Sequence, residues 1–381
     1  MCKKISIIAL CFLLIVIGCF AGCGSGGDED PIFVRANTLV NGIAYKNVYI
    51  YRRNNSTAEY FQLLNNLQPE GLPLYSDALA EGTENPFNAN NIILNLLMVD
   101  PIQTEKNGGT PVIIGCGSYS VRVEGELIPL MYDRIISYNV VTNEMKVIQE
   151  QIPNSISQMF LYGNTVYYVT NDGDAGSTIH RVDADGQNYL SMENPDALRY
   201  SVETIYADRV YYTSPEGLHS CTLTFEDHKL HTSAAGGSKV GIFCNGDYIY
   251  YTNHSKEYPF EGGKYPAIGE SLCRISISGN GEEEILFDGI YAGMNCNGML
   301  YYVSAKNAEA PYDMGYNVLY EYNTETGETR EIFDVSEEEY DLHLQIATED
   351  YLICNKLNLA AGESSMCAVD LETLEVTSIP Q

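Results

Sequence analysis

Side chains that could perform catalysis or bind a metal are scattered along the chain. Of the six histidines, only His228 and His231 lie close together in the sequence. A spacing of three residues places them on opposite faces of a strand, so we do not expect them to share a metal ion. The chain lacks the His-Glu-x-x-His, Gly-x-Ser-x-Gly and Gly-x-x-x-x-Gly-Lys motifs of metalloproteases, serine hydrolases and phosphate-binding loops. We therefore predict no catalytic residue, no metal ligand and no cofactor.

Aromatic side chains gather in two long segments, residues 254–269 and 305–317, which we predict to be variable loops. Each follows a strand-like stretch with two adjacent tyrosines, so the two should be neighbours in space. Aromatic side chains bury a large area at a small cost in rotamer entropy, which suits recognition of a peptide, a protein or a glycan. In the alternative interpretation, the same rings pack over their own strands and bind nothing. The predicted ligand-binding residues are Tyr258, Phe260, Tyr265, Tyr312 and Tyr316.

The N-terminal residues resemble a bacterial lipoprotein signal. A lysine pair precedes a short apolar run, and Phe20-Ala21-Gly22-Cys23 resembles a lipobox, in which the cysteine receives the lipid. Cys19 is a second candidate, but Cys23 is followed by a polar, glycine-rich stretch suited to a tether. The alternatives are a simple secretion signal or a membrane-spanning anchor. We predict a signal peptide over residues 1–22, lipid attachment at Cys23, and a tether over residues 23–35 of an extracytoplasmic protein anchored to the bacterial cell membrane.

The chain is strongly acidic, with 21 basic and 51 acidic residues and a formal net charge of −30. Removing residues 1–22 removes two lysines and no acid, which leaves 19 against 51 and a net charge of −32. A field of this sign repels phosphate backbones and anionic lipid headgroups. We therefore expect no nucleic-acid partner, membrane contact through the N-terminal lipid only, and a preference for cationic ligands. In the alternative view, the acidic side chains only solvate the strand edges.

A strand-like phrase with two adjacent tyrosines recurs from residue 166 onward. The first tyrosines of its four copies are 44, 39 and 51 residues apart, close to the length of one four-stranded propeller blade. Each copy follows an inner strand and precedes a second alternating strand and, after a turn, an outer strand. The copies are Val166-Tyr167-Tyr168-Val169, Val210-Tyr211-Tyr212-Thr213, Ile249-Tyr250-Tyr251-Thr252 and Leu300-Tyr301-Tyr302-Val303.

Degenerate copies at Val48–Tyr51, Pro111–Ile114 and Tyr351–Cys354 bring the number of units to seven. The first unit is the weakest because residues 57–91 carry no third-strand phrase. Six blades with an N-terminal extension are the alternative. In either case, residues 36–381 are predicted to form one all-β domain, a β-propeller of four-stranded blades, because a blade buries both faces only between other blades.

The Tyr-Tyr-Thr-Asn strand at 250–253 and the Arg-Val-Asp-Ala-Asp-Gly stretch at 181–186 resemble the YWTD-type β-propellers of low-density-lipoprotein-receptor relatives. The bacterial form of this domain occurs, without known function, on secreted lipoproteins. The resemblance covers residues 150–379 well and residues 36–149 loosely, and the chain has no tryptophan. It implies a fold and a habit of binding; it implies nothing catalytic, and no binding residue is carried over from the receptor family.

Seven cysteines remain beyond Cys23, an odd number that cannot all pair within one chain. By alignment of the repeats, Cys273 and Cys367 occupy the slot of Tyr320, so most of the thiols are predicted to be buried apolar residues. One cross-strand disulfide, between Cys354 and Cys367, is an alternative. We therefore predict a lipid-anchored ligand-binding or protein-interaction module. The alternative is a hydrolase or lyase that acts on a cell-surface polymer from the propeller axis.

Overall fold

The described residues form strands and one short 3-10 turn, η1 (Gly173–Ala175), and the isolated residues Gln103 and Lys106 are helical. Among these residues, no helix has the length and apolarity needed to cross a membrane. The computed structural model describes residues 33–35, 94–100, 103, 106, 112–121, 130–139, 145–233, 240–258, 267–279, 281–296, 298–304, 317–337, 340–347, 351–358 and 361–379.

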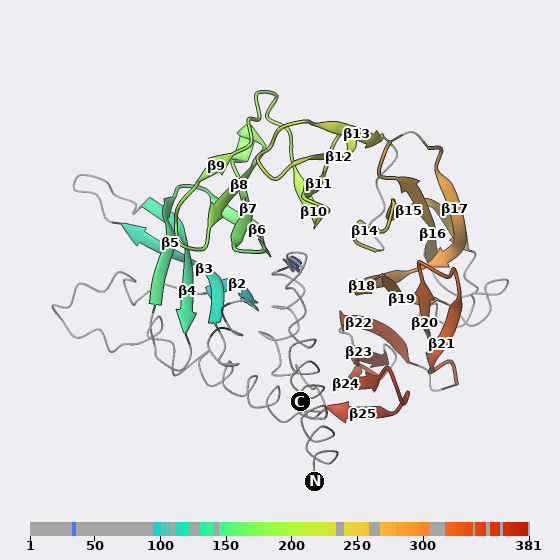
Figure 1. Cartoon of the computed structure of the whole chain (residues 1–381). Helices are drawn as coiled ribbons and strands as arrows, with labels where there is room; N and C mark the ends of the chain where they lie inside the picture. The colour runs from blue at the N-terminus through green and yellow to red at the C-terminus, as the bar shows by residue number, and fades with distance from the viewer. Residues whose placement is uncertain are drawn as a thin grey trace, which may run out of the picture. The chain divides into compact units, whose positions relative to one another are not determined.

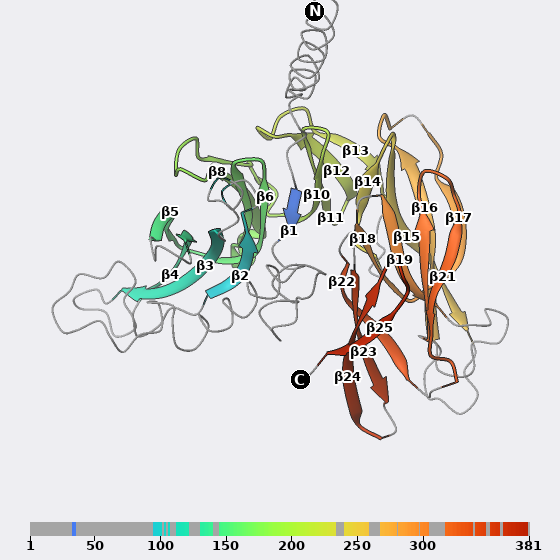
Figure 2. The same ribbon diagram turned by 60° about the horizontal axis from the view of Figure 1, so that its bottom comes forward.

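The strands form six antiparallel sheets, in which sequence neighbours pair with one another (Figures 1 and 2). The first sheet contains β2 (Leu94–Val99), β3 (Val112–Val121), β4 (Leu130–Asn139) and β5 (Met145–Ile152). The second contains β6 (Ser155–Tyr162), β7 (Thr165–Asn171), β8 (Ser177–Asp183) and β9 (Leu190–Ser191). The third contains β10 (Ser201–Tyr206), β11 (Arg209–Ser214), β12 (Gly217–Thr222) and β13 (Lys229–Thr232).

The second half of the chain repeats the pattern. The fourth sheet contains β14 (Phe243–Asn245), β15 (Tyr248–Tyr258), β16 (Ala267–Ser276) and β17 (Glu284–Ile290). The fifth contains β18 (Ala292–Cys296), β19 (Met299–Ser304), β20 (Val318–Asn323) and β21 (Thr329–Asp334). The sixth contains β22 (Asp341–Ala347), β23 (Tyr351–Asn358), β24 (Glu363–Asp370) and β25 (Val376–Ile379).

Each sheet thus contains a four-stranded meander, the unit of a β-propeller, and the predicted all-β propeller fold is confirmed. Six of the seven predicted units appear as sheets. The seventh, around Val48–Tyr51, lies outside the described residues, so a count of seven blades stays a prediction. One extra strand, β1 (Phe33–Arg35), lies within the predicted tether and pairs with β6, which makes the second sheet five-stranded.

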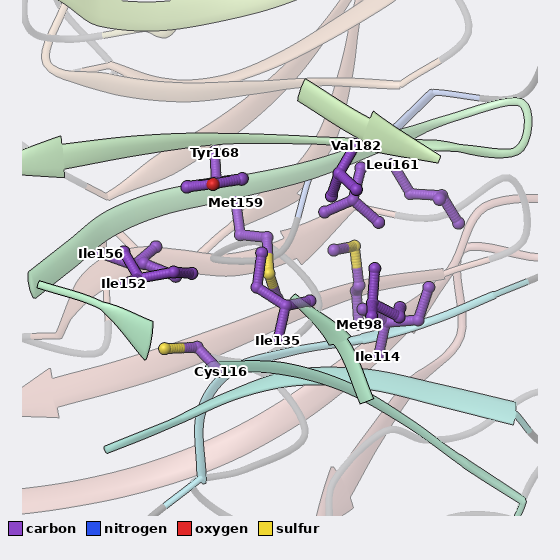
Figure 3. Close-up of a cluster of buried hydrophobic side chains, with 12 residues drawn as sticks. Met98, Ile114, Cys116, Ile135, Ile152, Ile156, Met159, Leu161, Tyr168 and Val182 are labelled. Carbon is purple, nitrogen blue, oxygen red and sulfur yellow. The ribbon is translucent and has the colours of Figure 1, made fainter. Parts of the chain in front are cut away.

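Neighbouring sheets pack face to face through five buried clusters in the described part of the chain. Figure 3 shows the first, where Ile114 and Ile135 of the first sheet meet Met159 and Tyr168 of the second. The other four clusters join the second sheet to the third, the third to the fourth, the fourth to the fifth and the fifth to the sixth. The core of the protein is therefore divided into layers, each shared by two sheets.

The two tyrosines of each repeated phrase face opposite clusters. In the fourth sheet, Tyr250 lies in the cluster shared with the fifth sheet, whereas Tyr251 lies in the cluster shared with the third. Tyr301 and Tyr302 divide in the same way between the two clusters that flank the fifth sheet. Alternation along a strand requires this division. The adjacent tyrosines therefore occur because the second strand of a sheet is buried on both faces.

The cysteines occupy the strand positions that alignment of the repeats predicts. Cys273 pairs with Tyr251 as Tyr320 pairs with Tyr302, and Cys354 pairs with Cys367. The four side chains of the first and last pairs are buried. Cys354 and Cys367 are not joined by a disulfide. The prediction that these cysteines act as buried apolar residues is confirmed.

The buried first tyrosine of each pair should contribute a large part of the free energy that holds two neighbouring sheets together. Tyr250 is 1% exposed, stacks on Phe243, and donates a hydrogen bond to the backbone oxygen of Thr324 in the next sheet at 3.2 Å. Tyr250→Ala should lower the free energy of unfolding by about 3–5 kcal/mol, and Tyr250→Phe by about 1 kcal/mol. Urea unfolding measures both. Tyr248→Ala, on the same strand but 36% exposed, is the control and should cost less than about 1 kcal/mol. Equal losses at the two positions would contradict the expected role of Tyr250.

Candidate functional site

Most of the predicted ligand-binding residues cannot be placed. Tyr258 is the last residue of β15, and its backbone pairs with Ala267. Phe260, Tyr265, Tyr312 and Tyr316 lie outside the described residues, as does the predicted lipid-attachment residue Cys23. The aromatic surface therefore stays a prediction.

The two ends of the segment 254–269 pair with each other as strands, whereas the sequence suggested an open loop. Pairing between β15 and β16 continues past Asn253 and Ser271 and ends with Tyr258 opposite Ala267. The inner strand β14 reaches only to Tyr250, and β17 reaches only to Glu270. Two strands of the fourth sheet therefore extend beyond the other two as a β-hairpin. The sequence pattern did not predict this pairing, because proline and glycine at 259–263 signal a turn and the pairing partners lie on both sides of it.

The first sheet carries a similar extension. Pairing of β3 with β4 continues to Val121 opposite Leu130, beyond the last partner of β2 at Gly117. Leu130 and Met131 at the end of this hairpin are 46% and 56% exposed. These two adjacent apolar side chains make the end of this hairpin a candidate for contact with another molecule.

Burial keeps His180 in its neutral form, and hydrogen bonds give both ring nitrogens a partner. Thr170 donates its hydroxyl hydrogen to the carboxylate Oδ1 of Asp172 at 2.8 Å, so its oxygen accepts from His180 Nε2 at 2.9 Å. His180 Nδ1 then accepts from the Tyr189 hydroxyl at 3.0 Å. Burial lowers the pKa of His180 to about 4, although the charge of Asp172 opposes the shift. Every nitrogen of the ring has a partner, and the Thr170 hydroxyl is buried, so the network is structural.

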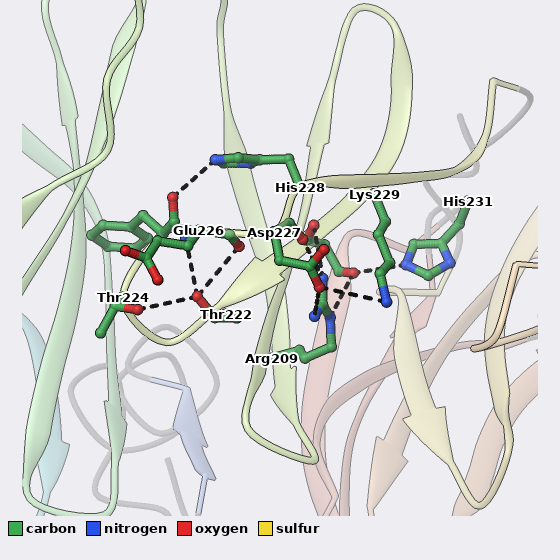
Figure 4. Close-up of polar contacts among 10 residues, drawn as sticks. Arg209, Thr222, Thr224, Glu226, Asp227, His228, Lys229 and His231 are labelled. Carbon is green, nitrogen blue, oxygen red and sulfur yellow. Dashed lines mark hydrogen bonds and ion pairs between the residues drawn. The ribbon is translucent and has the colours of Figure 1, made fainter.

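His228 and His231 bind different partners (Figure 4). His228 donates from Nε2 to the backbone oxygen of Phe225 at 3.0 Å and accepts from the Tyr212 hydroxyl at 2.9 Å. His231 Nε2 lies 2.8 Å from the hydroxyl oxygen of Ser220. These contacts fit the expectation that the two histidines do not share a metal ion.

One group of chemically versatile side chains does converge in the described part of the chain. His254, Cys273 and Glu283 each offer one ligand atom, and these three atoms lie within 4.8 Å of one another. His254 Nε2 and the Glu283 carboxylate form a close ion-pair contact. Tyr251 and Asn253 both donate to the second carboxylate oxygen, Oε2, at 2.5 and 3.3 Å. We call these three residues the His-Cys-Glu cluster.

The backbone places His254 in this cluster through a β-bulge. His254 and Ser255 together lie opposite the single residue Glu270, between the pairs Asn253 with Ser271 and Lys256 with Gly269. His254 has a φ of 54°, in the left-handed region that few non-glycine residues adopt. A bulge turns one side chain away from the alternation of the strand. The ring therefore meets Glu283 even though the two residues are 29 apart in the sequence.

The electrostatics of the cluster differ from residue to residue. Burial opposes ionisation of Glu283, but hydrogen bonds from Tyr251, His254 and Asn253 outweigh it and lower the pKa of this carboxyl. Burial, the charge of Glu283 and the charge of Asp288 raise the pKa of the Cys273 thiol to about 12. A buried, protonated thiol is a poor nucleophile. The cluster is therefore not the catalytic apparatus of a cysteine hydrolase.

Sequence reasoning missed the cluster because its members come from three separate segments. Aligned repeats place Cys273 beside Tyr251, but they do not reveal the bulge at His254. The only signal was indirect, since His254 follows a tyrosine-pair strand by three residues and Glu283 precedes the next outer strand.

Comparison with known proteins adds no family. No family model matches the chain, and no curated protein sequence matches it. Among solved structures, an uncharacterized protein from Listeria monocytogenes has a TM-score of 0.48 and 10% identity over 71% of this chain and 79% of its own. The β-propeller domain of the Trilobed protease from Pyrococcus furiosus has a TM-score of 0.46 and 11% identity over 71% of this chain and 82% of its own. The fold assignment rests on the strand order itself.

Protonation of His180 should make stability depend on pH. The folded pKa of about 4 lies below the ordinary value of 6.5, so the unfolded chain takes up a proton first as the pH falls. The contribution of neutral His180 to the free energy of unfolding is fully present above pH 6.5, and it is lost as the pH falls from 6.5 to 4. Urea unfolding across this window should show decreasing stability, and His180→Asn should reduce the slope. An NMR titration midpoint of His180 near 6.5 would contradict the expected shift.

Proposed function

We propose that this protein is an exported, lipid-anchored β-propeller that binds a peptide, protein or glycan through the hairpins that join the second and third strands of its sheets. The observation that supports this most directly is the extension of β15–β16 beyond the rest of its sheet. This hairpin leads into residues 259–266, where part of the aromatic surface is predicted. A paired hairpin supports a binding segment more rigidly than an open loop does, which lowers the entropy lost on binding.

The hairpin of β3 and β4 also supports binding at the connections between second and third strands. Its exposed residues Leu130 and Met131 lie next to the connection between the second and third strands of the first sheet. Exposed apolar residues also occur on outer strands, for example Ile285 on β17. Such outer-strand residues lie at sheet edges, so substituting them provides a control for substitutions of the hairpin residues.

The charge of the chain indicates the kind of ligand. An excess of acidic over basic residues, 51 against 21, attracts cationic groups and speeds their association. Lys256, Lys264 and Lys306 fall within the two predicted binding segments. A ligand with a basic surface and an acidic or polar patch for these lysines fits both features.

A binding screen tests the proposed surface. The fragment that begins after Gly27 is screened by thermal shift against basic peptides, glycans and cell-surface polymers, and each hit is titrated by calorimetry. Tyr265→Ala, Tyr312→Ala and Met131→Ser should each weaken binding, with a loss of about 2 kcal/mol at a central aromatic residue. Ile285→Ser is the matched control because Ile285 is 53% exposed and Met131 is 56% exposed.

The outcomes separate three interpretations. Weaker binding in the hairpin variants at an unchanged melting temperature supports the proposal. A lower melting temperature at unchanged affinity shows that the rings pack against the protein and that the proposed surface is wrong. Release of soluble fragments from a polymer would support the hydrolase or lyase alternative instead.

The proposed anchoring has its own test. Cys23→Ser removes the thiol that would carry the lipid, so the protein should either remain as an uncut precursor or leave the membrane fraction. Mass spectrometry of the N-terminus together with cell fractionation measures both effects. Cys19→Ser is the control and should leave processing unchanged. An unmodified mature N-terminus in the wild-type protein would contradict lipid attachment.

A further inference from the structure

We propose that the His-Cys-Glu cluster is a binding site for a divalent transition-metal ion, with zinc as the ion that its ligand atoms fit best. The site would use His254, Cys273 and Glu283 as ligands and leave one position for a water molecule or an external group. It lies within the fourth sheet and does not depend on the hairpin surface proposed above.

The three side chains offer ligand atoms of the types that zinc binds. One imidazole nitrogen, one sulfur and one carboxylate oxygen are the three ligand types that zinc takes in proteins, and three protein ligands with one open position are typical of a reactive zinc site. Ligand atoms of a tetrahedral zinc ion lie roughly 3.3–3.7 Å apart, given bond lengths of about 2.0–2.3 Å. The three atoms here lie within 4.8 Å of one another. His254 Nε2 and Glu283 Oε1 are in direct contact, so they would move apart by about 1 Å to admit the ion, and the half-exposed His254 side chain can rotate to do so.

Hydrogen bonds orient the carboxylate of Glu283 toward the cluster. Tyr251 and Asn253 hold Oε2 by hydrogen bonds, so the other oxygen, Oε1, points to His254. Metal-binding carboxylates are commonly oriented by such outer hydrogen bonds. Glu283 thus has the orientation of a ligand before any ion arrives. The ion would take the place of the direct contact between His254 and Glu283.

The Cys273 thiol is buried and makes a long hydrogen bond. Its thiol is fully buried, and its one hydrogen-bond acceptor, the backbone oxygen of Ser271, is distant at 3.8 Å. A metal ion binds the thiolate, so the sulfur–hydrogen bond breaks, the proton passes to solvent, and the electron pair stays on sulfur for the metal. An ion between Cys273 and Glu283 also neutralises two groups that oppose each other when both are charged.

A cobalt titration tests the site. Cobalt(II) replaces zinc in tetrahedral sites, and a bound thiolate gives it a near-ultraviolet charge-transfer absorption. The untagged full chain in detergent should bind one equivalent and develop this band. Cys273→Ser should remove the band, whereas Cys221→Ser should keep it, because Cys221 is an equally buried thiol in the neighbouring sheet and lies outside the cluster.

Two further variants keep the test independent of folding defects. The side chain of His254 is 48% exposed, so His254→Ala should fold normally, and Glu283→Gln preserves shape. Each should weaken cobalt and zinc binding by at least about 10-fold, and zinc should raise the melting temperature of the wild type more than that of either variant. A band that survives Cys273→Ser, or binding unaffected by His254→Ala and Glu283→Gln, would overturn the proposal.

Discussion

Burial of one strand on both faces is the constraint on which the rest of the structure depends. The second strand of each sheet lies between two cores, so its residues must be apolar on both sides. Tyrosine meets this requirement and adds a hydroxyl that can reach beyond the core. Tyr167 donates to the backbone oxygen of Leu223, and Tyr250 donates to that of Thr324. Both acceptors directly follow the third strand of the next sheet, so the same contact recurs at equivalent positions.

This constraint explains which parts of the fold could be predicted from the sequence. The repeated phrase specified the strands, the burial of the tyrosines and the slots filled by Cys273 and Cys367, because each depends on alternation along one strand. The extended hairpin could not be predicted in the same way. Its formation depends on pairing between residues before and after a turn, and the proline and glycine of the turn dominate the local signal. The predicted aromatic site falls largely outside the described residues, so the sequence remains its only support.

The same constraint explains why most histidines are structural. A polar ring next to a two-sided core is stabilised when its nitrogens have hydrogen-bond partners. His180 stacks on Tyr168 and bonds to Thr170 and Tyr189, and His228 bonds to Tyr212. In each case a tyrosine supplies part of the environment. Sequence patterns cannot distinguish such a ring from a ligand, since the partners belong to other strands.

His254 differs because it lies at the point where the regular sheet ends and the hairpin extension begins. The bulge that places His254 and Ser255 opposite Glu270 interrupts the register of β15 and β16 at this boundary. A bulge increases the local twist of the strand that carries it. It also frees the His254 side chain from the alternation, so that the ring meets Glu283 and Cys273. One backbone irregularity therefore marks the start of the hairpin extension and also brings the His254 ring to Glu283.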